Sequence, residues 1–515
     1  MTTESFINNP ETEKRWLIQC TKSFKLDKET AIDFSPYICQ VPKTIKESKI
    51  QSYIPQKIGL GPYHCFRPEF FVTERHKLTI AKNCMDFSKV QHLITETLIF
   101  FEPIIRAQYD KFLDIDTHAL CWILTIDSLY LLHFLNSYIP YQEIDSEGRS
   151  LAQEKEIDSE RRSLAQDIIM LENQIPCVVL IEIQMALNQP YSKLFKDLFF
   201  NFCKAHSPLQ LSEKRKFRSF KFCKALSPHL LAYMHQLIVN NRAIIEEEGE
   251  EYDDSKCYFD GYNRSFEDHI VVKVVKNIAG IIPGGDIVEK PMSLMSQLPW
   301  DHITGLITKE DENKPQIEEI EIPSVTELEE IAKVKFKLTE GGIRDIKFVE
   351  EGSEHTFYLP QITLNSDTEV ILRNLVAYEA ATASPESSLE LAEYVDFMCG
   401  IVDTTKDVNI LKKANIIKDG SSLNDEEIAE LFNGITKTSG KFNKKKSDLE
   451  KAIETVNEKF DNTLRVKTYR FIKKYIYTSW KFLTLFSTVL LILLICLQVF
   501  CQVYGCSNRW FRTSS

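Results

Sequence analysis

Apolar residues recur at intervals of three and four along much of the chain, which is the spacing of a helix that is buried on one side. This pattern predicts helices at Thr73–Phe101, Thr368–Thr382, Leu389–Gly400 and Asp425–Phe432. These predicted helices lie on both sides of the middle of the chain. We therefore expect a mainly helical body.

Strand-like alternation of apolar and polar residues occurs in one region, directly after a predicted helix start. Ser324 can cap that helix, and Glu327, three residues later, completes a capping box. The segments VKFKL, IRDIKFVE and TFYLPQITL then alternate between apolar and polar residues, and turn-like EGG and EEGSEH separate them. We expect a small antiparallel sheet near residues 334–365.

Two segments are apolar enough to suggest membrane helices, but only one of them is free of charge. Thr117–Ile139 is interrupted near its centre by Asp127 and His133, so we interpret it as a buried core helix; a second span is the alternative. Phe482–Asn508 contains no charged residue, and Leu483–Val503 consists mainly of Leu, Ile, Val and Phe. About 21 residues at 1.5 Å rise cover roughly 31 Å, the thickness of the hydrocarbon core of a bilayer.

We therefore expect one transmembrane helix at residues 482–505, flanked by aromatic residues typical of membrane interfaces, Trp480, Tyr504 and Trp510. Six Lys and Arg residues at 465–481 precede it, whereas only two basic residues follow it. This asymmetry predicts a cytosolic body at either the plasma membrane or the endoplasmic reticulum. The same cations suit contact with anionic lipids. A body outside the cell is the alternative topology.

Composition and charge suggest how the chain is divided. The net charge of −12 argues against nucleic-acid binding, because no domain-wide basic surface is available to replace counterions. The acidic run EEEGEEYDD and the nearby Pro- and Gly-containing stretches predict a partly disordered insertion. The expected segments are an N-terminal segment (1–33), the first part of the helical body (34–239), the insertion (240–322), the second part of the body (323–440), a basic stalk helix (441–481), the transmembrane helix (482–505) and a short tail (506–515).

The chain lacks the common signatures of catalysis and of metal or cofactor binding. It contains no HExxH, GxSxG, P-loop, GxGxxG or protein-kinase set. Its thirteen cysteines are scattered and include no CxxC pair, so reduced core thiols are expected and not a disulfide framework or a zinc site. We predict no catalytic, cofactor-binding or metal-binding residues, and we expect that the protein is not an enzyme.

The stretch DIIMLENQIPCVVL (167–180) places three adjacent polar residues, Glu172–Gln174, inside an apolar run. One interpretation is an active site that also uses His64 or His76. In the other, Pro176 breaks the helix, Asn173 and Gln174 donate to the carbonyls freed at its end, and Glu172 accepts from amides of the segment that restarts at Cys177. We favour this structural joint.

Seven stretches occur in the following order along the chain: IPQKIGLGPYH, ERHKL, DIIMLENQIPCVVL, SVTELEEIAKVKFK, FYLPQITLNSDTEVILRNLVAYEA, YVDFMCGIVDTTKDVNILKK and the carboxyl-terminal apolar segment. Together they resemble one family, the plant-specific domain of unknown function 247, also called uncharacterised protein family 0481. The resemblance covers about residues 34–505. Its family-motif residues include Gly61, Pro62, Tyr63, His64, Glu172, Asn173, Gln174 and Pro176, for which we expect structural roles.

The resemblance implies a helical body with a single carboxyl-terminal span, no established enzymatic activity and no catalytic residues. Some grass members are associated with self-incompatibility loci, which makes recognition or signalling at a plant membrane a plausible role. Together with the residue patterns, it suggests a membrane-anchored interaction module with protein partners. The alternatives are an enzyme using the polar cluster near Glu172 and a cell-surface recognition protein.

Overall fold

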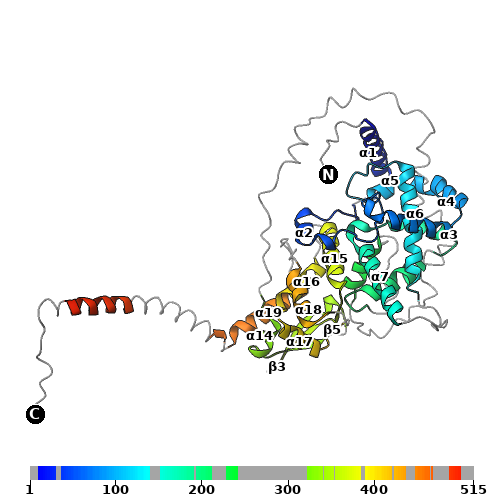
Figure 1. Ribbon diagram of the computed structural model, residues 1–515. Coiled ribbons are helices and arrows are strands. Elements are labelled where there is room, and N and C mark those ends of the chain that lie inside the picture. The colour runs from blue at the N-terminus through cyan, green and yellow to red at the C-terminus, as the bar shows by residue number, and fades with distance from the viewer. Residues whose placement is uncertain are drawn as a thin grey trace, which may run out of the picture.

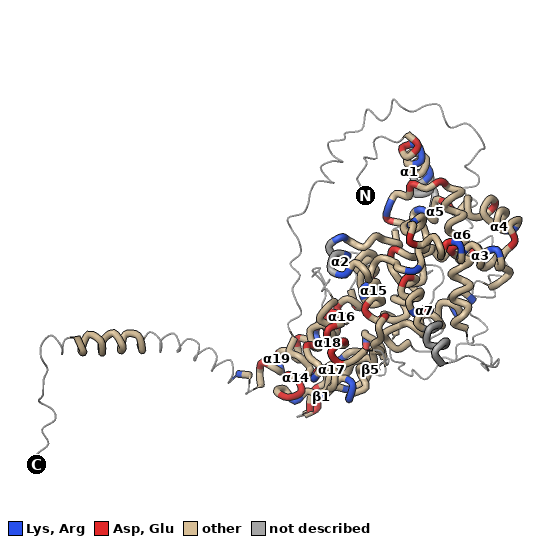
Figure 2. The backbone as a smooth tube through the Cα atoms, in the orientation of Figure 1, with Lys and Arg blue, Asp and Glu red and all other residues tan. Residues whose placement is uncertain are grey.

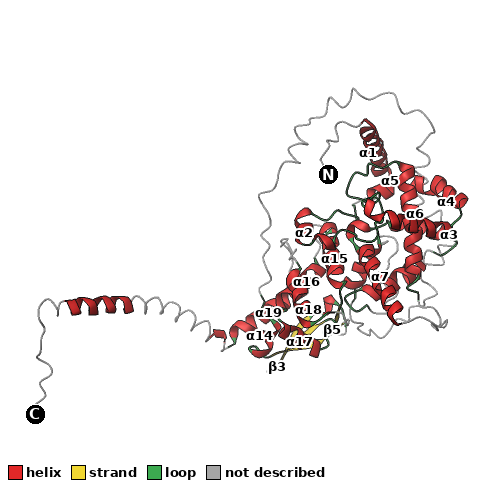
Figure 3. Ribbon diagram, viewed as in Figure 1, coloured by secondary structure: helices red, strands yellow, loops and turns green. Residues whose placement is uncertain are grey.

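The computed structural model shows a mainly helical body with two small sheets, and a further helix near the carboxyl end (Figure 1, Figure 3). The prediction of a mainly helical fold is confirmed. The residues that the structure describes are 10–30, 36–139, 151–190, 193–211, 228–241, 322–339, 341–352, 354–383, 389–419, 423–435, 447–463, 466–467 and 486–499.

The first half of the body is built around α6 (Thr117–Asn136), whose side chains are buried on most sides. It packs against α3 (Phe71–Cys84), α5 (Ile99–Ala107) and α8 (Cys177–Ala186). The other elements of this half are α1 (Pro10–Thr30), α2 (Lys43–Ser48), η2 (Ile50–Ser52), η3 (Pro68–Phe70), α4 (Phe87–Leu93), η4 (Ile94–Leu98), α7 (Leu151–Ile169), η5 (Leu171–Asn173), η6 (Leu194–Phe199), α10 (Phe200–His206) and α11 (Leu230–Val239).

The second half contains three of the helices that the apolar spacing predicts. These are α15 (Thr368–Thr382), α16 (Glu390–Ile401) and α18 (Asp425–Gly434), and each begins within one residue of its expected start. The capping box that begins at Ser324 is present at the start of α14 (Val325–Glu330). The remaining helices are α17 (Thr405–Lys413) and α19 (Asp448–Asn462), and η11 (Ile343–Asp345) is a single 3-10 turn.

The strands form two small sheets and not one antiparallel sheet. In the first, β3 (Glu354–Leu359) lies between β1 (Val334–Leu338), to which it is parallel, and β2 (Lys347–Glu351), to which it is antiparallel. The second pairs β4 (Ile362–Leu364) in parallel with β5 (Ile417–Asp419). The prediction of strands at residues 334–365 is confirmed, and β2 and β3 are antiparallel as expected, but the parallel pairing of β1 and the separate sheet of β4 were predicted wrongly. The proline between β3 and β4 has no N–H to continue the ladder, so TFYLPQITL is divided between two sheets.

One apolar core runs through both halves of the body. Helix α15 packs against α7 and η5 of the first half, and buried apolar residues form a single cluster from Ile38 to Val456. The two parts predicted as 34–239 and 323–440 therefore share their core. Most of the insertion predicted between them, residues 242–321, lies outside the described residues.

The two apolar segments have opposite environments. By length and composition, α6 is the single unbroken helix among the described residues that could cross a bilayer, but 61% of its apolar window is buried inside the body. The bent pair Ser159–Ile169 and Leu171–Ala186 would be long enough only as one broken span. The carboxyl-terminal segment is described as a shorter helix, Phe486–Val499, with exposed side chains. A span at 482–505 is therefore not shown, and Trp480, Tyr504 and Trp510 lie outside the described residues.

Helix α19 occupies the start of the predicted stalk but belongs to the body. Its apolar stripe, which includes Leu449, Ile453 and Val456, is buried, and the helix packs against β2. It ends at Asn462, because Thr463 adopts an extended conformation. One continuous stalk helix over 441–481 is therefore not observed. The first part of this region, α19, packs against the three-stranded sheet. Apart from 447–463 and 466–467, the predicted stalk lies outside the described residues.

Candidate functional site

The family-motif loop at residues 56–64 meets the 167–174 segment at a buried polar joint. Asp167, in the last turn of α7, accepts hydrogen bonds from the backbone N–H groups of Gln56 (3.0 Å), Lys57 (2.5 Å) and Ile58 (2.9 Å). Burial raises the pKa of the Asp167 carboxyl, and the three N–H donors oppose that shift. One side chain thus fixes three consecutive residues of the loop.

Asn173 continues this attachment and is itself fully buried. Its Oδ1 accepts from the N–H of Leu60 (2.6 Å), while Nδ2 donates to the carbonyls of Ile58 (3.0 Å) and Asp167 (2.8 Å). The amide therefore pairs with the loop as a neighbouring strand would, and it also satisfies a carbonyl near the end of α7.

Gln174 satisfies the other carbonyls at this helix end. Its Nε2 donates to Ile168 (2.7 Å) and Met170 (2.9 Å), and its Oε1 accepts from the N–H of Leu231 in α11 (3.1 Å). The sequence predicts such amide donors at the break before Pro176, and the structure contains them. Pro176 directly precedes α8, and the helices on either side of the joint are bent by 94°.

Glu172 has different partners from those expected. Its carboxylate accepts from the N–H of Val41 (2.9 Å) and from Lys46 Nζ (3.1 and 3.0 Å). The expectation that it binds amides at the start of α8 is wrong, because Cys177 N–H donates to the carbonyl of Pro228 (2.8 Å). Glu172 itself lies in the 3-10 turn η5, and its partners are Val41, just before α2, and Lys46, within α2.

His64 lies beside Glu172, with 3.7 Å between Nε2 and Oε2. The ring is 2% exposed, and neither ring nitrogen has a hydrogen-bond partner. Burial, together with the positive charges of Arg67 and Lys46, lowers the pKa of His64 to about 3, so the ring is neutral. His76 is not brought to this cluster: it is exposed on α3 and its ring contacts Tyr130.

A second buried cluster holds the glycines of the loop, and the sequence patterns did not identify it as a unit. Lys77 Nζ donates to the Gly59 carbonyl (2.5 Å), to Glu74 (2.6 Å) and to Asp127 in α6 (2.7 Å). Burial disfavours the Lys77 cation, but the two carboxylates raise its pKa overall. Asp127 also accepts from Gly61 N–H (2.8 Å). The sequence signals were Asp127, a charge inside an apolar helix, and the motif ERHKL, which contains Glu74 and Lys77, but nothing in the sequence connected them.

The remaining loop residues are also tied to the body. Gly61 has a φ of +69°, and a Cβ there would lie 3.0 Å from the Gln174 carbonyl oxygen. Pro62 follows in the turn, where its carbonyl accepts from the Cys65 thiol. The Tyr63 hydroxyl donates to Asp110 (2.6 Å). The motif residues therefore bind mainly backbone groups and one another.

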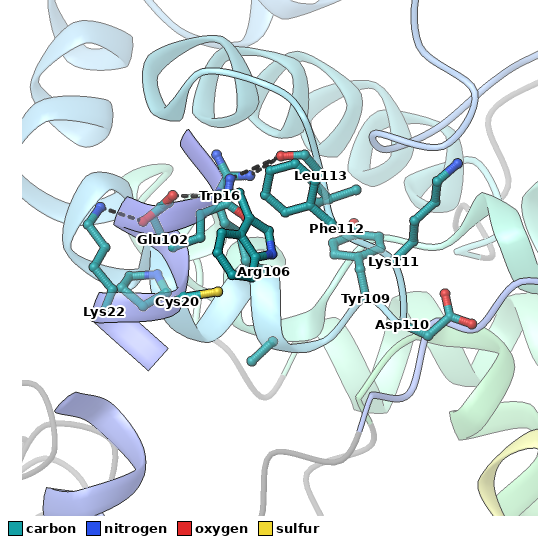
Figure 4. A pocket seen from close by; sticks show the side chains of 13 residues that line it. Trp16, Cys20, Lys22, Glu102, Arg106, Tyr109, Asp110, Lys111, Phe112 and Leu113 are labelled. Carbon is teal, nitrogen blue, oxygen red and sulfur yellow. Dashed lines mark hydrogen bonds and ion pairs between the residues drawn. The ribbon is translucent and has the colours of Figure 1, made fainter. Parts of the chain in front are cut away.

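A separate pocket of about 360 Å³ lies between α1, α5 and the loop that follows α5 (Figure 4). Helix α1 is held there by ion pairs of Arg15 with Asp114 (2.7 Å) and of Lys22 with Glu102 (2.9 Å). Glu102 also pairs with Arg106, so these charges are used within the protein. Glu172, Asn173 and Gln174 do not line this pocket. Among the described residues, no group of three His, Cys, Asp or Glu side chains is arranged to hold a metal ion.

Comparison with known proteins agrees with the motif order. A family model described as a plant protein of unknown function, DUF247, matches residues 38–494. A putative UPF0481 protein of Arabidopsis thaliana is 32% identical, over 97% of this chain and 96% of the relative. A second UPF0481 protein of the same plant is 22% identical, over 91% and 87%. No solved structure matches. The chain therefore belongs to the plant DUF247 family, whose description names no enzymatic activity.

Proposed function

We propose that this protein is a membrane-anchored interaction module, held by its carboxyl-terminal apolar segment and acting by binding other proteins and not by catalysis. The observation that carries the proposal is helix Phe486–Val499, which is apolar on every side and whose large side chains are all exposed. Figure 2 shows no Lys, Arg, Asp or Glu on it. A helix that is apolar all round is stable only inside a protein core or a bilayer.

The flanking sequence supports a span and its orientation. The uncharged segment continues on both sides of this helix, so residues 482–505 are long enough to cross a bilayer. The excess of basic residues at 465–481 supports a cytosolic body and contact with anionic lipid.

The buried joint supports a role other than catalysis. The carboxylates of Asp167 and Glu172 accept from backbone amides and, for Glu172, from Lys46, and these bonds hold a loop in place. Neither carboxylate lines the pocket beside α1. Carboxylates that are hydrogen-bonded in this way stabilise a fixed backbone conformation, which suits a protein that acts by binding.

The anchoring half of the proposal is tested with the full chain tagged at its amino terminus and expressed in plant cells. We expect the protein in the membrane pellet after alkaline carbonate extraction, with the tag digested by protease added to sealed, cytosolic-side-out vesicles. A matched variant lacking residues 482–505 should move to the soluble fraction. A full-length chain extracted by carbonate, or a protected tag, would contradict the anchor or its orientation, respectively.

The interaction half is tested by proximity labelling from a ligase fused to the amino terminus. We expect a reproducible set of neighbours that is absent when the same ligase is joined to residues 465–515 alone. An identical set of neighbours from both fusions would show that the body selects no partner.

A further inference from the structure

Helix α3 reverses the usual distribution of polar and apolar residues on a surface helix. The side chains that it buries are those of Lys77 and Ala81, and Lys77 is only 1% exposed. Its three large apolar residues Phe71, Val72 and Leu78 are instead 62%, 78% and 40% exposed. A surface helix normally turns its apolar stripe toward the core. The outer side of α3 is therefore an apolar surface that the described part of the body leaves uncovered.

The turn before α3 adds another exposed aromatic ring. Phe66 is 77% exposed and has a φ of +62°, a left-handed conformation that costs free energy for a bulky side chain. The turn that follows it is closed by a hydrogen bond from Phe70 N–H to the Arg67 carbonyl (3.1 Å). Phe66 and Phe71 therefore lie on either side of a single turn. Backbone strain of this kind is concentrated at binding sites and switch regions.

The buried joint described above holds Phe66 in this exposed position. His64, two residues before it, and Phe70, four residues after it, are both 2% exposed. Phe70 packs directly on the loop, because a Cβ added at Gly59 would lie 2.9 Å from its ring. Since both flanking residues are fixed in the core, the segment between them passes over the surface. The joint thus presents the Phe66 ring to a binding partner.

Two cations lie on the same outer side of α3. Arg75 is one turn beyond Phe71, and its guanidinium lies 5.1 Å from the centre of the Phe71 ring. Lys82 is seven residues beyond Arg75, so it projects from the same side of the helix. Both cations are exposed, and neither forms an ion pair with any described carboxylate. The one acid within α3, Glu74, pairs with Lys77 (2.6 Å).

We propose that this surface binds an acidic amphipathic helix of a partner protein. The inference rests on the interaction role proposed above, and it names the surface that performs that role. The partner helix packs its apolar stripe on the exposed rings, and its carboxylates pair with the two cations. Aromatic and Arg side chains are the types that dominate binding energy at interface centres. The α3 surface consists of Phe66, Phe71, Val72, Arg75, Leu78 and Lys82.

Two other occupants fit the charges and the position of the α3 surface less well. In a symmetric dimer, residues near the two-fold axis meet their own copies, so Arg75 in the middle of the stripe would face a second Arg75. Like charges in such positions oppose association. A bilayer is disfavoured by position, because α3 lies at the opposite end of the body from α19, which precedes the proposed anchor in the chain (Figure 1). Glu69 and Asp86, exposed at the two ends of α3, also oppose an anionic bilayer.

Photo-crosslinking identifies what covers the α3 surface. The probe is p-benzoylphenylalanine incorporated in place of Phe71 in the full chain in plant cells, and the crosslinked peptide is sequenced by mass spectrometry. We expect a segment of another protein with helical apolar spacing and with Asp or Glu beside its stripe. The same probe in place of Ile50, which is exposed in η2, is the control and should not give this adduct.

The other outcomes of this experiment overturn the proposal. An adduct with lipid would assign the α3 surface to a bilayer, and an adduct with the chain itself would assign it to a second copy or to another segment of the same copy. A crosslinked segment rich in Lys and Arg would contradict the acidic partner. A yield at position 71 no higher than that at position 50 would show that nothing binds there.

Phe66→Gly separates binding from folding. Glycine adopts positive φ without strain, which offsets its greater freedom in the unfolded chain, so the denaturation midpoint should be nearly unchanged. The variant should nevertheless lower the adduct yield at position 71 by about tenfold, because it removes an aromatic anchor. Ile50→Ser, which removes another exposed apolar side chain, should leave the yield unchanged. An undiminished yield in Phe66→Gly would overturn the proposal.

Charge reversal tests the acidic character of the partner. Arg75→Glu should lower the adduct yield at position 71 several-fold, because it places a carboxylate opposite the carboxylates of the partner. Lys413→Glu makes the same change in net charge at an exposed site on α17 and should have no effect. Equal yields in these two variants would overturn the acidic assignment.

Proximity labelling distinguishes failure of this inference from failure of the interaction role. A natural chain without reproducible neighbours would refute the interaction role itself. A set of neighbours that Phe66→Gly and Arg75→Glu both retain would refute only the α3 surface.

Discussion

Helix α6 and helix Phe486–Val499 are both strongly apolar, yet the structure places them in opposite environments. Helix α6 is surrounded by other helices, and its one buried carboxylate, Asp127, is bonded to Lys77 and to Gly61 N–H. Helix Phe486–Val499 has no charged residue, and its large apolar side chains are exposed. The difference shows that hydropathy indicates only that a helix is unstable in water. Whether the helix is buried in the protein or in a bilayer depends on whether its charged residues have partners.

The most direct test of this difference is to place the same charge in both helices. Leu124→Arg in α6 should prevent folding, because an unpaired cation at a fully buried site costs more than about 4 kcal/mol. Leu493→Arg should leave unfolding of the body unchanged and weaken only membrane retention. Denaturant unfolding of the detergent-solubilised chain and carbonate extraction measure the two effects. A folded Leu124→Arg body would show that α6 is not a core helix.

The buried ion pair is the next test of what makes α6 a core helix. Lys77→Met leaves Asp127 without its cation and should lower the free energy of unfolding by about 3–5 kcal/mol. Lys82→Met, an exposed site on the same helix, should change it by less than about 0.5 kcal/mol. Both are measured by denaturant unfolding followed by tryptophan fluorescence. Equal effects would mean that the Lys77–Asp127 pair contributes no more than a surface charge.

A pH titration should affect the body but not the carboxyl-terminal helix, which carries no acid or base that titrates near neutrality. Burial lowers the pKa of His64 to about 3, of His206 to about 4 and of His229 to about 3. The unfolded chain therefore binds about three more protons below pH 6.5. The resulting stability is present above that pH and is lost as the pH falls toward 4.

Between pH 6 and pH 5 these histidines should lower the free energy of unfolding by roughly 4 kcal/mol. In His64→Leu, the change in the free energy of unfolding with pH should correspond to about one proton fewer. The substitution should have little other effect, because the His64 ring makes no hydrogen bond that it would remove. Membrane retention should not change over the same range. A slope in His64→Leu equal to that of the natural chain would show that His64 titrates normally in the folded state.

The smallest expected difference is between two glycine substitutions. It separates the cost of a strained backbone from the cost of a steric clash at the joint beside α6. Gly61 and Gly352 both have positive φ, but only at Gly61 would a Cβ meet another group, the Gln174 carbonyl. Gly352→Ala should therefore cost about 1 kcal/mol from backbone strain, whereas Gly61→Ala should cost about 2–4 kcal/mol. Equal losses in denaturant unfolding would show that the loop can move away from Gln174.

Much of the helical fold could be predicted because local periodicity and capping act over a few residues. Helix α15 has the bounds that the apolar spacing indicates, and the capping box at Ser324 is present. The donors of Gln174 at the end of α7 were also predictable, because a proline two residues later forces a helix break near there. Each of these inferences depends on residues that are close together in the chain.

The contacts that cross the chain could not be predicted in this way. Glu172 binds Val41, Lys77 reaches Asp127, and β4 pairs with β5 after several intervening helices. Alternation identifies a strand but not its neighbour, and a polar residue shows that it needs a partner but not which one. The sequence by itself determined where helices form and that Phe482–Asn508 carries no charge. Only the tertiary structure decided which polar groups meet, because that choice depends on how the helices pack around one shared core.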